Sequence, residues 1–231
     1  MAPKHRWQAE GAKITPSRSC RPHTPLPSPS MLDRYATALI RPTVQRLGQR
    51  LARAGVSANQ LTVAGFLIGL LAALLIAFHA YLAAVMAVLV SRACDALDGA
   101  VTRHGTATHR GGFLDITLDF LFYASIPLAF ALADPPRNAL AAAVLLAAFV
   151  GTASSFLAFA AIAARRGVLS TAYPDKSLYC LGGLTEATET LVLFVAMCLW
   201  PPHFAVLAYG FSVACAVTIG SRLWWGWKAF A

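Results

Sequence analysis

Six long apolar runs, each close to the length of a membrane-spanning helix, constrain this chain more than any other feature. A helix needs about 20 apolar residues to cross the hydrocarbon core of a bilayer. The chain is 58% hydrophobic and only 13% charged, which is too apolar for a soluble globular protein of 231 residues. We therefore predict an all-α integral membrane protein with six transmembrane helices. The runs cover residues 61–81, 82–102, 112–133, 139–164, 178–200 and 203–221.

The residues before the first run divide into two segments. Residues 1–30 are rich in Pro, Ser and basic residues and contain no apolar stretch long enough for a signal peptide. We predict a disordered basic tail there, followed by one membrane domain over residues 31–231, with Met31 as an alternative start of translation. From Tyr35 to Ala54 apolar residues recur three or four apart with arginines between them, which predicts an amphipathic helix at the membrane interface.

The basic residues are placed as a membrane protein would place them. Ten of the 19 Lys and Arg lie in the first 54 residues, without a nucleic-acid-binding motif, so we expect contact with anionic lipid and not with nucleic acid. Cations in short connections mark the cytoplasmic side. We therefore expect a plasma (inner) membrane protein with both termini in the cytoplasm. The cations on the predicted cytoplasmic side after the first helix are Arg103, Arg110, Arg165, Arg166, Lys176, Arg222 and Lys228.

Four aspartates interrupt the second and third runs. Asp95 and Asp98 are three residues apart near the end of the second run, and Asp115 and Asp119 are four apart near the start of the third. Each pair therefore shares one helix face. The two helices are predicted to be antiparallel with a short cytoplasmic loop, so the pairs lie at similar depth and can face each other.

Carboxylates gathered in a low-dielectric site repel one another by several kcal/mol unless cations neutralise them. Two divalent ions would do so, and ligation by oxygen alone favours Mg²⁺ or Mn²⁺ over zinc. The alternative is that the aspartates are solvated at the headgroup level or paired with Arg92 and Arg103. Two matched pairs on adjacent helices favour the metal site.

The residues around the aspartates resemble a known signature. Asp95-x-x-Asp98-Gly99-x-x-Thr102-Arg103, seven residues, then Gly111-x-x-x-Asp115-x-x-x-Asp119 resembles the motif of the CDP-alcohol phosphotransferase family, D-x-x-D-G-x-x-A-R followed by G-x-x-x-D-x-x-x-D. Thr102 stands at the Ala position. The plan of six helices after an amphipathic one is also similar to the family. Ahead of the first run, Ala58, Asn59 and Thr62 match the family's P-N-x-x-T element, with Ala in place of Pro.

This resemblance implies an enzyme of phospholipid biosynthesis that transfers a phosphatidyl group from a CDP-linked lipid such as CDP-diacylglycerol to an alcohol and releases CMP. It also implies a homodimer. Such a displacement mainly needs charge neutralisation and alignment of the nucleophile. The resemblance makes Asp95, Asp98, Asp115 and Asp119 the metal ligands, with Asp119 also the general base. The nucleotide- and diphosphate-binding residues that it implies are Asn59, Thr62, Gly99, Thr102, Arg103 and Gly111.

The alcohol acceptor stays open. Arg110 and Lys176 would suit a phosphorylated acceptor, although the positive-inside rule alone also explains such cations. Glu186 and Glu189 form a second acidic pair, which either pairs with Arg92 or binds a cationic or polyhydroxy acceptor. The Thr- and Glu-rich fifth run is similar to a bacterial inner-membrane branch of the family.

An ion-coupled transporter that uses the same carboxylates is the alternative function. The runs contain no paired Gly or Pro breaks at mid-span, and the aspartates lie near one surface, both of which argue against it. A silent relative that only binds nucleotide lipid is less consistent with an intact acidic set.

Overall fold

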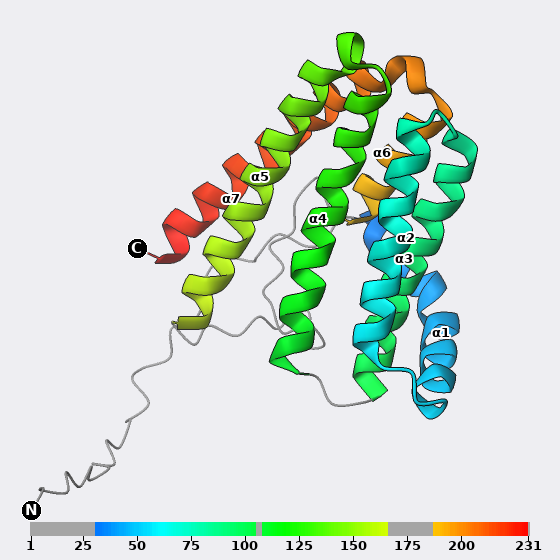
Figure 1. Cartoon of the computed structure of the whole chain (residues 1–231). Coiled ribbons are helices and arrows are strands. Elements are labelled where there is room, and N and C mark those ends of the chain that lie inside the picture. Colours follow the sequence, from blue (N-terminus) through cyan, green and yellow to red (C-terminus); the bar gives the residue numbers. More distant parts are fainter. Residues whose placement is uncertain (1–30, 105–107, 166–186, 231) are drawn as a thin grey trace, which may run out of the picture.

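The computed structural model describes residues 31–104, 108–165 and 187–230, and this part of the chain is helical without strands. The predicted tail, residues 1–30, lies outside it. In order along the chain (Figure 1), the elements are α1 Met31–Arg53, α2 Ala58–Ala77, α3 Tyr81–His104, α4 His109–Ala133, α5 Pro135–Arg165, α6 Ala187–Leu199, the 3₁₀ turn η1 Pro201–His203 and α7 Phe204–Phe230.

Within the described ranges, four helices are long and apolar enough to cross a membrane: α2, α4, α5 and the segment formed by η1 and α7. Helix α3 has 24 residues, but it carries Arg92, Asp95, Asp98 and Arg103. Helix α6 is described over 13 residues, and the earlier part of the fifth run lies outside the described residues. The structure therefore shows four of the six predicted spans by length and composition.

Two described helices extend beyond the apolar runs that predicted them. Helix α5 begins at Pro135 and not near residue 139, because proline fits the first turn of a helix, where its missing N–H is not needed. The Asp134 carboxylate caps this turn by accepting from the backbone N–H of Arg137 at 3.4 Å. At the other end of the chain, α7 continues past residue 221 to Phe230.

The turn between α1 and α2 is fixed by local signals. Gly55 has a φ of +83°, a left-handed conformation that glycine adopts without strain, and it ends α1. Ser57 and Gln60 then form a capping box: the Ser57 hydroxyl accepts from the Gln60 N–H at 3.3 Å, and the Gln60 side chain accepts from the Ser57 N–H at 3.0 Å. The first turn of α2 is thereby held in place.

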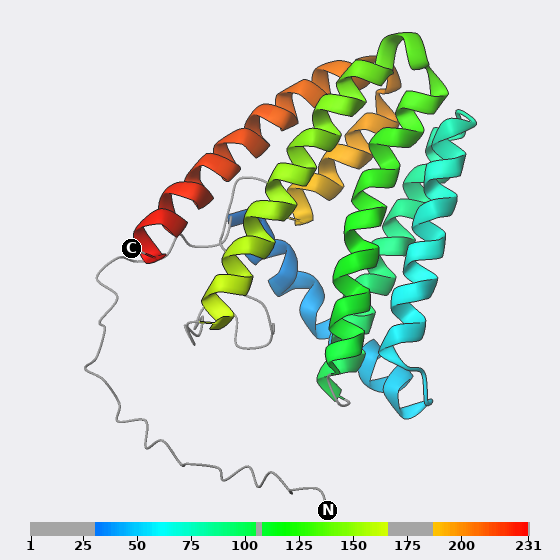
Figure 2. The ribbon, with the colours of Figure 1, turned by 60° about the vertical axis from the view of Figure 1, so that its left-hand side comes forward.

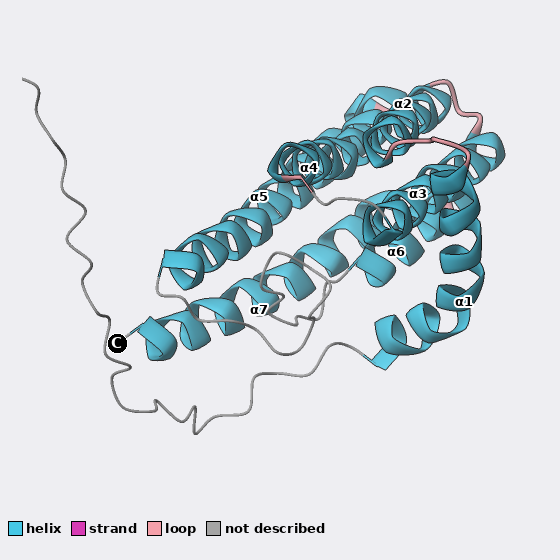
Figure 3. Ribbon diagram, turned by 90° about the horizontal axis from the view of Figure 1, so that it is seen from below, coloured by secondary structure: helices cyan, strands magenta, loops and turns pink. Residues whose placement is uncertain are grey.

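The long helices pack in two rows. Figure 3 shows α5, α4 and α2 in one row and α7, α6 and α3 in the other, which agrees with the contacts of α2 with α3 and α4, and of α5 with α4 and α7. In Figure 2, α4 and α5 form a hairpin, and α5 runs beside α7. Helix α1 packs against α3 and α6. Helix α1 corresponds to the predicted amphipathic segment, Tyr35 to Ala54. Its position at the membrane interface stays a prediction.

Aromatic side chains fill the space between the rows. Phe194 of α6 contacts Phe122 of α4 and Phe149 of α5, with ring centroids 6.1 and 6.2 Å apart. Towards the other end of α4, Phe130 stacks on Phe204 of α7 at 4.5 Å. These rings pack the second half of α4, which follows the turns that carry Asp115 and Asp119, against α6 and α7, and Phe194 connects this packing to α5.

Three glycines permit close helix approach around α3. A Cβ atom on Gly65 of α2 would lie 3.0 Å from the Cβ of Cys94, and one on Gly69 would lie 2.4 Å from the Phe122 ring. On α1, a Cβ atom on Gly48 would lie 2.5 Å from the Cβ of Ala100. Helix α3 is therefore held closely by α2 and α1 along the part that carries the aspartates.

We predict that Gly69→Ala destabilises the protein. The added methyl group overlaps the buried Phe122 ring, and overpacking of this kind lowers the free energy of unfolding by about 1 to 3 kcal/mol. Thermal unfolding in detergent measures the effect. Gly210→Ala is the matched control, because this helical glycine has open space around it. Equal unfolding midpoints for the two variants would contradict the packing argument.

Candidate metal and nucleotide site

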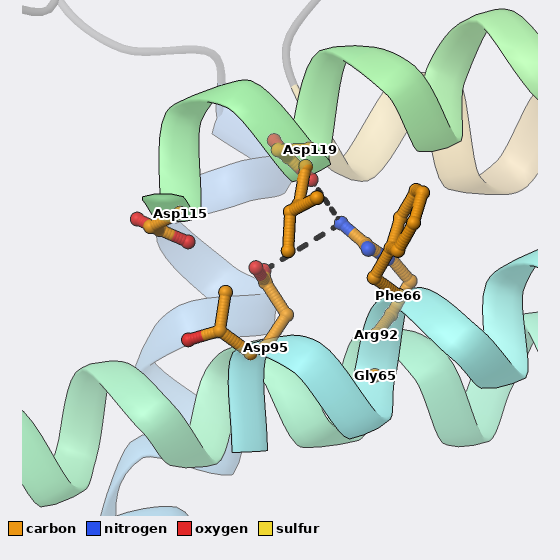
Figure 4. Close-up of a pocket in the computed structure, with 8 residues that line it drawn as sticks. Gly65, Phe66, Arg92, Asp95, Asp115 and Asp119 are labelled. Atoms are coloured by element: carbon orange, nitrogen blue, oxygen red, sulfur yellow. Dashed lines mark hydrogen bonds and ion pairs between the residues drawn. The ribbon is translucent and has the colours of Figure 1, made fainter. Parts of the chain in front are cut away.

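Three carboxylates meet where the second half of α3 faces the first half of α4. Asp95 and Asp98 from α3 and Asp115 from α4 each offer an oxygen atom, and these atoms lie within 4.8 Å of one another. Asp98 is buried, whereas Asp95 and Asp115 are partly exposed. Figure 4 shows Asp95 and Asp115 facing each other across the gap between the helices.

This donor set fits a hard divalent cation. Mg²⁺ and Mn²⁺ are bound by carboxylate oxygens, and the three oxygens here need only small side-chain movements to reach one ion. The group contains no sulfur or imidazole ligand that would favour zinc. Asp95, Asp98 and Asp115 are therefore the residues that can hold a metal.

Thr62 of α2 orients one of these carboxylates. Its hydroxyl donates to Asp98 Oδ2 at 2.6 Å and lies 3.0 Å from the carbonyl of Ala58. A hydrogen bond of this kind fixes the direction in which a ligand presents its oxygen atoms. The resemblance predicted that Thr62 binds the nucleotide. The structure shows Thr62 bonded to Asp98, one of the three aspartates that could hold a metal, and the nucleotide role stays a prediction.

Asp119 lies one helical turn beyond Asp115 and is paired differently. Its carboxylate forms an ion pair with Arg92 of α3, and Arg92 also lies 3.7 Å from Asp95. The two dashed lines in Figure 4 mark these contacts. Pairing with Arg92, the alternative weighed for the aspartates, is therefore found at Asp119 and Asp95. The role of Asp119 as a fourth ligand and as the general base stays a prediction.

Apolar side chains surround the guanidinium of Arg92. Its central carbon lies 4.0 Å from the centre of the Phe122 ring and 5.7 Å from that of Tyr123. These contacts were not predicted from the sequence, although a buried Arg one turn before Asp95 is a recognisable signal of a site. The small pocket beside it is lined by Thr62, Gly65, Phe66, Arg92, Asp95, Asp115, Leu118 and Asp119.

The residues expected to bind the nucleotide gather at the same end of the helices. Gly99, Thr102 and Arg103 lie in the last two turns of α3, and Gly111 lies in the first turn of α4. A Cβ atom on Gly111 would lie 2.9 Å from the side-chain oxygen of Asn59, so this glycine lets α4 approach α2. The structure thus brings the two segments of the signature together with the start of α2.

The acceptor candidates are only partly described. Arg110 is exposed in the first turn of α4, and Glu189 is partly buried in the first turn of α6. Lys176 and Glu186 lie outside the described residues.

A comparison with protein families decides among the functional classes. The sequence profile of the CDP-alcohol phosphatidyltransferase family matches residues 56–220, which is most of the chain and includes all four aspartates. The chain belongs to the CDP-alcohol phosphatidyltransferase family. The resemblance predicted from the signature is confirmed, and family membership favours the enzyme over the ion-coupled transporter.

Two relatives of this phosphatidyltransferase are similar in sequence. Inner membrane protein YnjF of Escherichia coli strain K12 is 49% identical over 197 residues, covering 85% of this chain and 96% of the relative. Archaetidylinositol phosphate synthase of Pyrococcus horikoshii is 44% identical over 98 residues, covering 40% of this chain and 52% of the relative. Together with the apolar helices, the first relative supports an integral membrane protein.

Solved structures share the fold. Phosphatidylinositol phosphate synthase PgsA1 of Mycobacterium tuberculosis with bound CDP-DAG has a TM-score of 0.63 and 22% identity, covering 80% of this chain and 93% of that chain. The same enzyme in complex with manganese and citrate has a TM-score of 0.62 and 23% identity, covering 80% and 88%. The phosphatidyltransferase described here therefore has the helical arrangement of an enzyme that was crystallised with a CDP-lipid.

We predict that Thr62→Val weakens metal binding. Without the hydroxyl, Asp98 loses a hydrogen bond that fixes its orientation, and loss of such a contact lowers metal affinity by about 10- to 100-fold. Titration with Mn²⁺, followed by electron paramagnetic resonance of the free ion, measures the change. Thr117→Val is the matched control, because the hydroxyl of Thr117 bonds the backbone carbonyl of Phe113 on an exposed face of α4. Unchanged affinity in Thr62→Val would contradict the assignment.

Proposed function

We propose that this enzyme transfers a phosphatidyl group from a CDP-linked lipid, such as CDP-diacylglycerol, to an alcohol acceptor and releases CMP in phospholipid biosynthesis. The observation that carries the proposal is the convergence of Asp95, Asp98 and Asp115 from two facing helices, in a chain of this family. A fold neighbour crystallised with CDP-DAG, and again with manganese, supports the donor class and the use of a divalent metal.

The proposed metal is Mg²⁺ or Mn²⁺, with two ions held by the carboxylates Asp95, Asp98, Asp115 and Asp119. When bound, these ions neutralise the charge of the diphosphate and favour departure of CMP. Around them we assign the diphosphate and cytidine to residues at the same end of the helices. These residues are Asn59, Gly99, Thr102, Arg103 and Gly111, with Thr62 supporting Asp98.

Asp119 is the proposed general base. Its carboxylate accepts the proton of the acceptor hydroxyl while that oxygen forms a bond to the lipid-bearing phosphorus, and the bond from this phosphorus to the oxygen of CMP breaks. Its position one turn from Asp115, at the edge of the carboxylate cluster, supports a role on the acceptor side of the site in addition to the proposed role as a ligand.

The acceptor class divides between two sets of residues. Arg110 and Lys176 favour a phosphorylated alcohol, whereas Glu186 and Glu189 favour a cationic or polyhydroxy one. The archaeal relative is named archaetidylinositol phosphate synthase and the solved neighbour phosphatidylinositol phosphate synthase, so inositol phosphate belongs in any panel of acceptors. A homodimer is the proposed assembly.

In the membrane, we propose six spans. Helix α3 has 24 residues, a length of about 36 Å, and it packs along α2, so it can cross a hydrocarbon core of about 30 Å. Its charged residues Asp95, Asp98 and Arg103 lie in its second half, towards the surface at which α2 begins. The remaining span is the apolar run 178–200, the fifth along the chain, which ends in α6. Helix α1 lies at the interface. The positive-inside rule places the active site and both termini in the cytoplasm of the cell, at its inner membrane.

Fusion reporters in a Gram-negative host test this topology. Green fluorescent protein fused after Ala231 is expected to fluoresce, and alkaline phosphatase fused there is expected to be inactive, because the C-terminus faces the cytoplasm. Alkaline phosphatase inserted at the turn after Asp134 is the control and is expected to be active. The opposite pattern of activities would contradict the proposed orientation.

The proposed reaction is tested with purified protein and CDP-diacylglycerol. We expect CMP release with Mg²⁺ or Mn²⁺ and an acceptor from a panel of alcohols, identification of the new phospholipid by mass spectrometry, and loss of both products in EDTA. Asp119→Asn is expected to lower turnover at least about 100-fold while the protein stays folded, because the general base is lost. Asp134→Asn, at the opposite end of α4, is the control and keeps full turnover. Normal turnover in Asp119→Asn would refute the assignment of Asp119 as the general base.

A further inference from the structure

Arg92 is a buried cation to which the proposed reaction assigns no role. It lies near the middle of α3, and its side chain is only 14% exposed. A charged side chain in a membrane-spanning segment is costly, by about 2.5 to 3.5 kcal/mol on insertion scales, unless it has partners. The partners of Arg92 therefore indicate what it does.

The contacts of Arg92 connect the three-carboxylate group to the proposed base, Asp119. One nitrogen of its guanidinium pairs with Asp119 of α4 and lies 3.7 Å from Asp95 of its own helix. The face of the guanidinium lies 4.0 Å from the centre of the Phe122 ring, and the ring of Tyr123 is 5.7 Å away. A planar cation held between two carboxylates and an aromatic face has little freedom to turn.

Asp95 belongs both to the carboxylate group that fits a metal and to the contacts of Arg92. Its oxygen is part of the three-carboxylate group that fits a metal, and it also faces Arg92. The other partner of Arg92, Asp119, lies outside that group. Arg92 therefore holds Asp119 beside the metal cluster, and it supplies positive charge to the same carboxylate that a metal would bind. Figure 4 shows the guanidinium between these two aspartates, with Phe66 on its far side.

We propose that Arg92 is a positioning residue that acts through Asp119: it fixes the Asp119 carboxylate at the edge of the metal cluster and serves as the built-in counter-cation of the site before metal binds. The kinetic consequence rests on the proposed function. The charge pairing itself does not, and it can be measured without turnover.

The first test is a double-mutant cycle on thermal unfolding of the full chain in detergent with EDTA. Arg92→Gln and Asp119→Asn each remove one member of the ion pair and leave the other charge without it, so each is expected to lower the unfolding midpoint. The double variant removes both charges, and we expect its midpoint to be no lower than that of Arg92→Gln. Additive losses would show that Arg92 only fills space over Phe122, and would overturn the proposal.

The second test separates turnover from donor binding. Arg92→Gln is expected to lower kcat about 100-fold and Arg92→Lys about 10-fold, with the KM for CDP-diacylglycerol within about 2-fold of the unaltered protein, because loss of a supporting contact costs activity in this range. Lys keeps the charge but loses the planar fork, which explains the partial rescue. An unchanged kcat, or a loss carried entirely by KM, would overturn the proposal.

Arg137→Gln is the matched control for both tests. Arg137 also faces an aspartate three residues away, with 3.8 Å between Arg137 Nε and Asp134 Oδ2, but its side chain is 80% exposed and lies in the first turn of α5, beyond the end of α4 that is far from the site. It is expected to leave the unfolding midpoint and kcat unchanged. A non-additive cycle in a protein without CMP release would refute the proposed function and retain the pairing. CMP release with an additive cycle would refute the role of Arg92 alone.

Discussion

The arrangement of the site depends on the repulsion among the carboxylates of α3 and α4. Asp95, Asp98 and Asp115 present oxygen atoms within 4.8 Å of one another, in a chain that is 58% hydrophobic. Like charges this close repel one another and favour positive charge beside them. Arg92 supplies it on one side of the cluster, and the proposed divalent cation would supply it on the other.

The neighbouring helices hold this arrangement in place through contacts that few residue types could make. Gly69 leaves room for the Phe122 ring, and Phe122 in turn supports the guanidinium of Arg92. Thr62 reaches Asp98 from the first turns of α2, which the Ser57 capping box fixes. Small residues and helix caps outside the signature therefore decide how accurately the carboxylates are presented.

The four aspartates of the signature fall into two different environments, which supports different roles for them in the proposed transfer reaction. Three of them form the group that fits a metal, and Asp119 lies one turn away against Arg92. A carboxylate at the edge of this group suits the proposed role on the acceptor side of the reaction. Acceptor choice then depends on residues beyond the signature, including the segment before α6.

The sequence by itself determined the helical membrane fold, most helix boundaries and the family, because apolar run length and the spacing of Asp, Gly and Arg are local properties of the chain. It also indicated that the aspartate pairs face each other, since a short loop makes their helices antiparallel. Only the tertiary structure decided that Thr62 contacts Asp98 and that Arg92 pairs with Asp119 across 27 residues. Those contacts depend on the rotation and separation of packed helices, which are set by side chains far apart in the sequence.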